Sequence, residues 1–169
     1  EPLTQHLALL ALEWRSGKKA ANEMRDGQLK GAFQLHRMMG GQDGKAERAT
    51  HEYESNREYA ALMYGKAPLL FDELRKLLGN DAWERTLKRY VEENRYRWVT
   101  ARTLTDLAAQ ESKQGKKVAD LRAHWWEQTH GDDDLAVDLA GAMEADLLKG
   151  LDPELLKQME EMMKTLSGP

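Results

Sequence analysis

Few residues of this chain could take part in chemistry, and one tyrosine stands out by its position. Tyr64 opens the sequence Tyr64-Gly-Lys66-Ala-Pro68, which leads directly into a leucine-rich stretch. Proline is tolerated only in the first turn of a helix, so a helix has to begin close to Pro68. We therefore expect Tyr64 at or before the helix entrance, where its hydroxyl can reach a neighbouring cleft.

Composition limits the metal-binding and nucleophilic groups. The sequence contains no cysteine, which excludes disulfides and thiolate chemistry and leaves the redox compartment open. The pattern H-E-x-x-H, in which two histidines on one helix face bind zinc, does not occur. No histidine has another four residues away, so none can form that pair; the five are His6, His36, His51, His124 and His130.

Several sequence elements, in order, resemble one protein family. Tyr64-x-Lys66-Ala is similar to the Tyr-x-Lys-Gly/Ala element of the aminopeptidase-N-like zinc metallopeptidases, the gluzincin aminopeptidases. In that family an apolar helix, a Gly-Asp/Asn turn and a second amphipathic helix follow. The resemblance covers roughly residues 1–131. The matching stretches are residues 1–6, 64–78, 79–91, 95–107 and 118–131.

The resemblance implies roles for three residues. Tyr64 matches the tyrosine that donates a hydrogen bond to the oxyanion of the tetrahedral intermediate. Glu1 matches the third zinc ligand, although Pro2 replaces the usual glycine after it. Tyr59 would line the same substrate cleft. Each has a structural alternative: Tyr64 as a packed ring at a helix entrance, Tyr59 as a core or rim aromatic, and Glu1 as a frayed terminal residue.

The resemblance also implies a function. The chain would be the helical C-terminal part of a catalytic domain whose parent binds zinc and hydrolyses peptide bonds through zinc-activated water. At most one of the family's three zinc ligands is present, so we expect this chain alone to be inactive and to bind no zinc tightly. The implied partners are a peptide substrate and the missing N-terminal part of the domain, which would carry both histidines.

A second hypothesis assigns the chain no catalysis. It would be a helical protein-interaction module, derived from such a domain, that binds a partner through its acidic C-terminal tail. The sequence upstream of Glu1 in the parent gene separates the two hypotheses, because only the enzyme needs H-E-x-x-H there.

The elements that position these residues are all predicted to be helices. Residues 3–15 form an apolar-rich helix that stops near Gly17, and residues 18–39 form a second helical stretch. Four leucines within residues 70–78 share one helix face, and Gly79 then supplies a left-handed stop. No stretch alternates polar and apolar residues as a strand does. The predicted fold class is all-α, resembling the helical half of a thermolysin-like peptidase domain.

Residues 132–169 form a separate acidic part in this prediction. They carry ten acidic and three basic residues, and leucine or methionine recurs every three or four residues in two stretches. Asp152-Pro153 between the stretches is a strong helix-start signal. We expect a helical hairpin appended to the first 131 residues.

Bulk composition argues against two classes of partner. The net charge of −4 gives no support to general nucleic-acid binding, and no apolar run is long enough to span a membrane. Residues 95–98, Arg-Tyr-Arg-Trp, interleave basic and aromatic side chains as single-strand binders do. In an acidic helical protein we instead expect a packed turn with its arginines at the surface. Of the neighbours Trp125 and Trp126, we expect only one to face the core.

Overall fold

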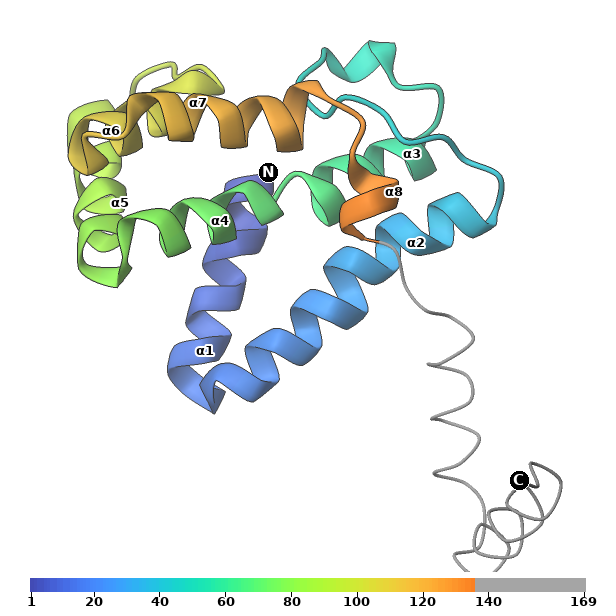
Figure 1. Ribbon diagram of the computed structural model, residues 1–169, viewed down its shortest axis with the longest axis horizontal. Helices are drawn as coiled ribbons and strands as arrows, with labels where there is room; N and C mark the ends of the chain where they lie inside the picture. The colour runs from blue at the N-terminus through green and yellow to red at the C-terminus, as the bar shows by residue number, and fades with distance from the viewer. Residues whose placement is uncertain (136–169) are drawn as a thin grey trace, which may run out of the picture. The chain divides into compact units, whose positions relative to one another are not determined.

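The computed structural model describes residues 1–135, and every regular element among them is helical (Figure 1). This confirms the all-α fold class for that part of the chain. The described residues belong to one compact unit, residues 1–136. The predicted C-terminal hairpin lies outside the described residues, apart from its first four positions.

Twelve elements make up the described residues. The first six are α1 (Pro2–Met24), η1 (Arg25–Lys30), α2 (Gly31–Met38), η2 (Thr50–Glu52), α3 (Asn56–Ala60) and η3 (Ala61–Lys66). The other six are α4 (Leu69–Leu78), α5 (Asn80–Asn94), α6 (Arg102–Ser112), α7 (Gly115–Arg122), η4 (Ala123–Glu127) and α8 (Gly131–Asp134). Of the short η elements, η1, η3 and η4 are π-helical and η2 is a 3-10 turn.

Gly17 divides α1 into two arms, as the sequence predicted. Its φ of 86° lies in the left-handed region, which glycine adopts without the clash that a Cβ would bring. The chain turns back at this point, and the second arm continues through η1 into α2 as one long rod (Figure 1). The first arm therefore returns Glu1 to the centre of the fold.

Helix α4 is the central element. It contacts α1, α5, α6 and α7, and its predicted apolar face is buried through Leu70 and Leu74. Gly79, with φ 80°, ends α4 and allows α5 to begin at the next residue. The leucine stretch that follows Pro68 is thus the helix on which the rest of the fold packs.

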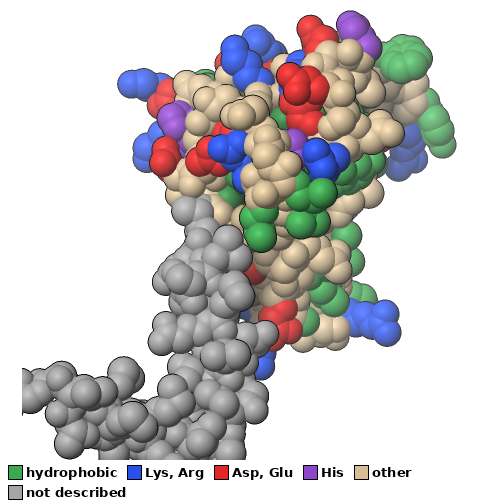
Figure 2. All heavy atoms as spheres, turned by 90° about the vertical axis from the view of Figure 1, so that its right-hand side faces the viewer, with side chains coloured by type: hydrophobic (Ala, Val, Ile, Leu, Met, Phe, Trp, Pro, Cys, Tyr) green, Lys and Arg blue, Asp and Glu red, His purple; other side chains and the backbone are tan. Residues whose placement is uncertain are grey.

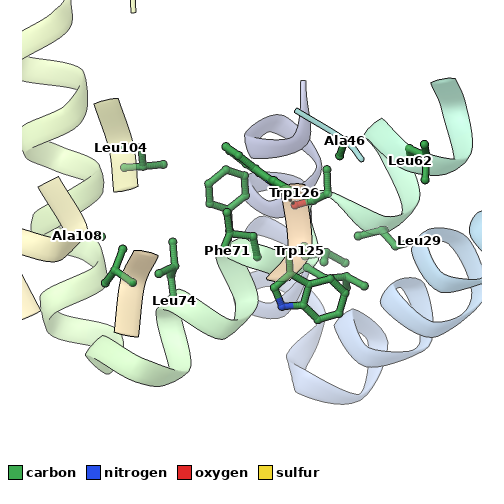
Figure 3. Close-up of a cluster of buried hydrophobic side chains, with 14 of the residues drawn as sticks. Leu29, Ala46, Leu62, Phe71, Leu74, Leu104, Ala108, Trp125 and Trp126 are labelled. Atoms are coloured by element: carbon green, nitrogen blue, oxygen red, sulfur yellow. Dashed lines mark hydrogen bonds between the residues drawn. The ribbon is translucent and has the colours of Figure 1, made fainter. Parts of the chain in front are cut away.

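Both tryptophans of η4 are buried in the same core, so the expectation that only one would face it was wrong. Figure 3 shows Trp126 beside Phe71, while Trp125 points another way from the same segment. The ring centroids of Phe71 and Trp126 are 5.7 Å apart, and Trp126 Nε1 donates to the Ala67 carbonyl at 3.0 Å. The reason is that the fold covers η4 on more than one side, which sequence periodicity does not reveal.

Lys66 is a fully buried cation that joins three chain segments. Its Nζ lies 2.9 Å from Asp43 Oδ1 and 2.9 Å from the carbonyl oxygen of Gln128. Asp43 Oδ2 also accepts a hydrogen bond from the backbone N–H of Gly131 at 2.9 Å. The loop after α2, the end of η3 and the start of α8 are therefore held together at one buried ion pair.

The loop between α5 and α6 is not the packed turn that the sequence led us to expect. Tyr96 and Trp98 are both fully exposed, and the arginines beside them are exposed as well. Tyr96 also has a φ of 62°, an unusual backbone conformation for a residue with a Cβ. The loop is exposed because no described element packs over it.

Charged side chains of both signs are also present at the surface. Figure 2 shows acidic and basic side chains interspersed over the face that carries α2 and α8, where Arg37 Nε pairs with Asp132 at 2.5 Å. Among residues 1–135, no helix combines the length and apolar character that crossing a membrane requires.

Candidate active site

The fold brings Glu1, Tyr59 and Tyr64 together, although the two tyrosines lie far from Glu1 in the sequence. The Tyr59 hydroxyl donates a hydrogen bond to Glu1 Oε2. The rings of Tyr59 and Tyr64 meet edge to face, with centroids 6.0 Å apart. Glu1 is exposed and both tyrosines are half-buried, so all three polar groups face accessible space.

The π-helical geometry of η3 explains how two tyrosines five residues apart share a face. On a regular α-helix of 3.6 residues per turn, their side chains would point about 140° apart. A π-helix instead bonds each N–H to the carbonyl five residues earlier, as Ala67 N does to Leu62 O at 2.8 Å. The wider turn rotates Tyr64 to the side on which Tyr59 meets Glu1.

Hydrogen bonding at this cluster separates the protonation states of its groups. The Tyr59 hydroxyl, and after it the Tyr64 hydroxyl, lower the pKa of the Glu1 carboxyl by stabilising its ionised form. The same carboxylate raises the pKa of Tyr59 to about 12, and it raises the pKa of Tyr64 as well. At neutral pH the site therefore holds one carboxylate facing two phenols that keep their protons.

A third tyrosine supports Tyr59 from behind. The rings of Tyr53 and Tyr59 meet edge to face with centroids 5.0 Å apart, and the Tyr53 hydroxyl donates to the Ala46 carbonyl at 2.7 Å. The Arg48 guanidinium lies 4.1 Å above the Tyr53 ring and pairs with Glu58. Glu58 belongs to α3, so this network fixes the helix that carries Tyr59.

A cavity of about 330 Å³ opens beside Glu1. Its walls come from the start of α1, the loop at 46–48, and residues 99–101, with an apolar floor that includes Phe71 and Trp126. A cavity of this size with an apolar floor and a few charged groups at its edge is typical of a small-ligand site. Glu1 thus stands between the tyrosine pair and the cavity.

A larger cavity, of about 930 Å³, lies away from this cluster. It is bounded by charged residues of η1, α4 and α7, and neither Glu1 nor the two tyrosines line it. Several of its charges already have partners, such as Arg25 with Asp72 and Lys76 with Glu73 at 2.7 Å. We place the candidate site at the smaller cavity because Glu1 lines it and the Tyr59 hydroxyl donates a hydrogen bond to Glu1.

The described residues do not by themselves form a zinc centre. No group of three or more histidine, cysteine, aspartate or glutamate side chains comes together among residues 1–135 in a way that could hold a metal ion. Glu1 is a single carboxylate, whereas zinc in proteins takes three or four protein ligands. Glu1 suits one such position, since it is ionised, accessible and oriented by a hydroxyl donor.

The sequence suggested each of the three residues separately, but not the contacts between them. The bond from Tyr59 to Glu1 and the supporting role of Tyr53 could not be foreseen, because they depend on the turn at Gly17 and on the π-helical turn. A spacing of five residues between two tyrosines is the one signal available, and it is weak on its own. No protein family, curated protein or solved structure matches this chain.

Proposed function

We propose that residues 1–135 form the helical part of the active site of a zinc metallopeptidase of the aminopeptidase type. The observation that carries the proposal is the convergence of Glu1, Tyr59 and Tyr64 beside a cavity. The resemblance places Glu1 and Tyr64 in separate sequence elements, with Tyr59 in the same cleft, and a peptidase of this kind needs them at one place. Three surface residues without a shared role would not be expected to lie in contact.

Tyr64 is the hydrogen-bond donor to the oxyanion in this proposal. A donor has to keep its proton through the reaction, and the raised pKa of Tyr64 keeps the phenol neutral at physiological pH. Tyr64 is half-exposed on a helical turn, so its hydroxyl can donate a hydrogen bond to a substrate carbonyl oxygen as negative charge develops on that oxygen. Such a preorganised donor stabilises the transition state more than the bound substrate.

Glu1 contributes a carboxylate ligand, and Tyr59 orients it. A hydroxyl donating to one carboxylate oxygen fixes the rotamer and leaves the other oxygen for the metal. The remaining ligands, two histidines, would have to come from a segment outside this sequence. Zinc, when bound in the completed site, would act as a Lewis acid toward the scissile peptide. The residues described here hold and orient; they do not complete that centre.

The test begins with the gene, which on this proposal encodes H-E-x-x-H shortly before Glu1. A protein extended to include that segment is then assayed for zinc content and for hydrolysis of an aminoacyl p-nitroanilide. We expect Tyr64→Phe to lower kcat by about 10²–10³ and to leave zinc content unchanged, because one transition-state hydrogen bond is lost. Glu1→Gln should lower zinc content instead.

Tyr53→Phe is the matched control. It removes a hydroxyl from the same aromatic group, but that hydroxyl donates to the Ala46 carbonyl and does not reach Glu1. Its kcat should stay within about two-fold of the unsubstituted protein, as for a change that removes no transition-state interaction. A gene without the histidine pair, or a Tyr64→Phe protein with nearly full kcat, would remove the basis for the peptidase assignment and favour the non-catalytic interaction module.

A further inference from the structure

The loop between α5 and α6 presents two large aromatic side chains entirely to solvent. Tyr96 and Trp98 are both fully exposed, and Val99 beside them is exposed as well. Aromatic side chains of this size bury roughly 150–250 Å² of surface when they pack against a partner. Two that remain exposed therefore contribute none of the favourable free energy that burial would give. Tyrosine and tryptophan are also the residue types that dominate binding energy in protein interfaces.

The same loop and the first residue of α6 carry arginines that have no charge partner in the described part of the chain. The side chains of Arg95, Arg97 and Arg102 make no ion pair or side-chain hydrogen bond within residues 1–135, and no acidic residue lies between 94 and 103. Elsewhere arginines are commonly paired, as Arg75 is with Glu13 at 2.5 Å. The loop is therefore a local site of uncompensated positive charge.

The loop is fixed at both ends, so its side chains are presented in a defined arrangement. Arg97 N donates to the Asn94 carbonyl at 3.0 Å, and Thr100 N donates to Thr103 Oγ1 at 3.1 Å. Tyr96, inside the first of these two turns, has a φ of 62°, which costs a residue with a Cβ some backbone strain.

We propose that residues 95–102, the arginine–aromatic loop, dock an acidic protein segment that also carries apolar side chains. The arginines would meet its carboxylates, and Tyr96 and Trp98 would cover its apolar groups. A long polyanion fits less well, because residues 1–135 carry equal numbers of basic and acidic residues and the whole chain is net negative. Attraction that is confined to one loop acts within a Debye length of about 10 Å, which suits a short segment. The inference does not depend on the proposed peptidase activity.

The full chain is tested with a fluorescein-labelled amphipathic peptide that has glutamates on one face and leucines on the other. We expect saturable binding by fluorescence anisotropy, weakened when salt rises from about 0.05 M to about 0.5 M because the charge contacts are screened. Trp98→Ala should weaken binding by at least about ten-fold, as for a hot-spot aromatic. The Arg95→Glu, Arg97→Glu double variant should abolish measurable binding.

The chain offers matched controls in α1. Trp14 is 90% exposed, and Arg15 is an exposed arginine without an ion pair among the described residues. Trp14→Ala and Arg15→Glu repeat the same chemical changes away from the loop, so the peptide's affinity should stay within about two-fold. Circular dichroism should show equal helix content in all variants, because neither the loop nor Trp14 belongs to the core.

Three results would each overturn the proposal. The first is no saturable peptide binding by the full chain at low salt. The second is equal loss of affinity in the loop variants and the α1 controls. The third is tighter binding to a single-stranded oligonucleotide, or to vesicles of anionic phospholipid, through the same arginines, which would assign the loop to another class of partner.

Discussion

Two polar clusters share one stretch of helix, α3 and η3, and they differ in how many of their polar groups are hydrogen-bonded within the protein. Lys66 is fully buried, and its ammonium group contacts Asp43, the Gly44 carbonyl and the Gln128 carbonyl at 2.9–3.2 Å. Tyr64, two residues earlier, has a half-exposed ring and faces the exposed Glu1 carboxylate. One motif thus supplies both a closed cluster and an open one.

This difference determines which of the two clusters can bind a ligand. A buried charge has lost its water and is stable only if protein groups replace all of it, so the Lys66 cluster has no capacity left for a substrate. The Glu1 cluster has a carboxylate oxygen and two hydroxyls at accessible positions, so it contributes little to stability and is available for binding. Substitutions at the Lys66 cluster should therefore lower stability, whereas substitutions at the Glu1 cluster should change binding and leave stability nearly unchanged.

The largest effect is expected from Lys66→Met. It would leave the Asp43 carboxylate buried without its cation, and breaking a buried ion pair in this way costs about 3–5 kcal/mol of unfolding free energy. Equilibrium unfolding in urea, followed by circular dichroism, measures this loss. The paired change Lys66→Met, Asp43→Asn should recover part of it, because no uncompensated charge remains.

Lys76→Met is the matched control for Lys66→Met. Lys76 also pairs with a carboxylate, Glu73 at 2.7 Å, but its side chain is largely in solvent. Exposed pairs of this kind contribute less than about 1 kcal/mol. Equal losses of unfolding free energy from the two substitutions would show that burial does not make the Lys66 ion pair more important for stability than an exposed one.

An intermediate effect is expected at Asp72, whose carboxylate is buried but meets a partly exposed arginine. Trp83 Nε1 donates to His6 Nε2 at 3.0 Å, so His6 Nδ1 carries the proton and donates to Asp72 Oδ1 at 2.8 Å. Burial alone would raise the pKa of Asp72, but the bond from His6 and the charge of Arg25 outweigh it and hold the pKa below its usual range.

The sign of the pH dependence follows from that lowered pKa. The carboxylate stabilises the fold above its unfolded pKa of about 3.9, and this stabilisation is lost as pH falls through the lower folded value. Asp72→Asn should cost roughly 2 kcal/mol at neutral pH and should make the acid limb of the stability profile shallower. Urea unfolding between pH 7 and pH 2 measures both. Glu73→Gln, the half-exposed neighbour, should leave the profile close to that of the unsubstituted chain.

Local signals in the sequence were sufficient for much of the fold. Gly17 and Gly79 each marked a real break, because a positive φ is a property of the residue itself. The burial of Trp125 beside Trp126 and the exposure of Trp98 were both missed. Those outcomes depend on which distant segments cover a residue, and periodicity along the chain carries no information about that.

The site shows the same division between local and distant information. The motif around Tyr64 indicated a hydroxyl near a helix entrance, and the tyrosine does lie before α4 begins, but it sits inside a π-helical turn instead of at an open helix end. That extra residue per turn is what aligns Tyr64 with Tyr59. Nothing in the local sequence favours a π-helix over an α-helix here, so the alignment is set by tertiary packing.

Glu1→Gln should have the smallest effect on stability. Its main effect should be on the pKa values of the two tyrosines that face Glu1, Tyr59 and Tyr64. Hydrogen bonding to the Glu1 carboxylate is the first cause of the raised pKa of Tyr59, about 12, and of the raised pKa of Tyr64. A neutral amide accepts a weaker hydrogen bond and carries no charge, so both pKa values should fall toward the usual value of about 10. Tyr53 is an internal control, because burial is the main reason that its pKa is raised. Tyrosines labelled with ¹³C at Cζ and titrated by NMR report each ring separately.

Since a raised tyrosine pKa stabilises the fold below pH 10 and loses that contribution toward pH 12, the substitution should also flatten the alkaline limb of the stability profile. A Tyr59 signal that titrates near 10 in the unsubstituted chain, or one that Glu1→Gln leaves in place, would show that the three residues do not form one electrostatic unit.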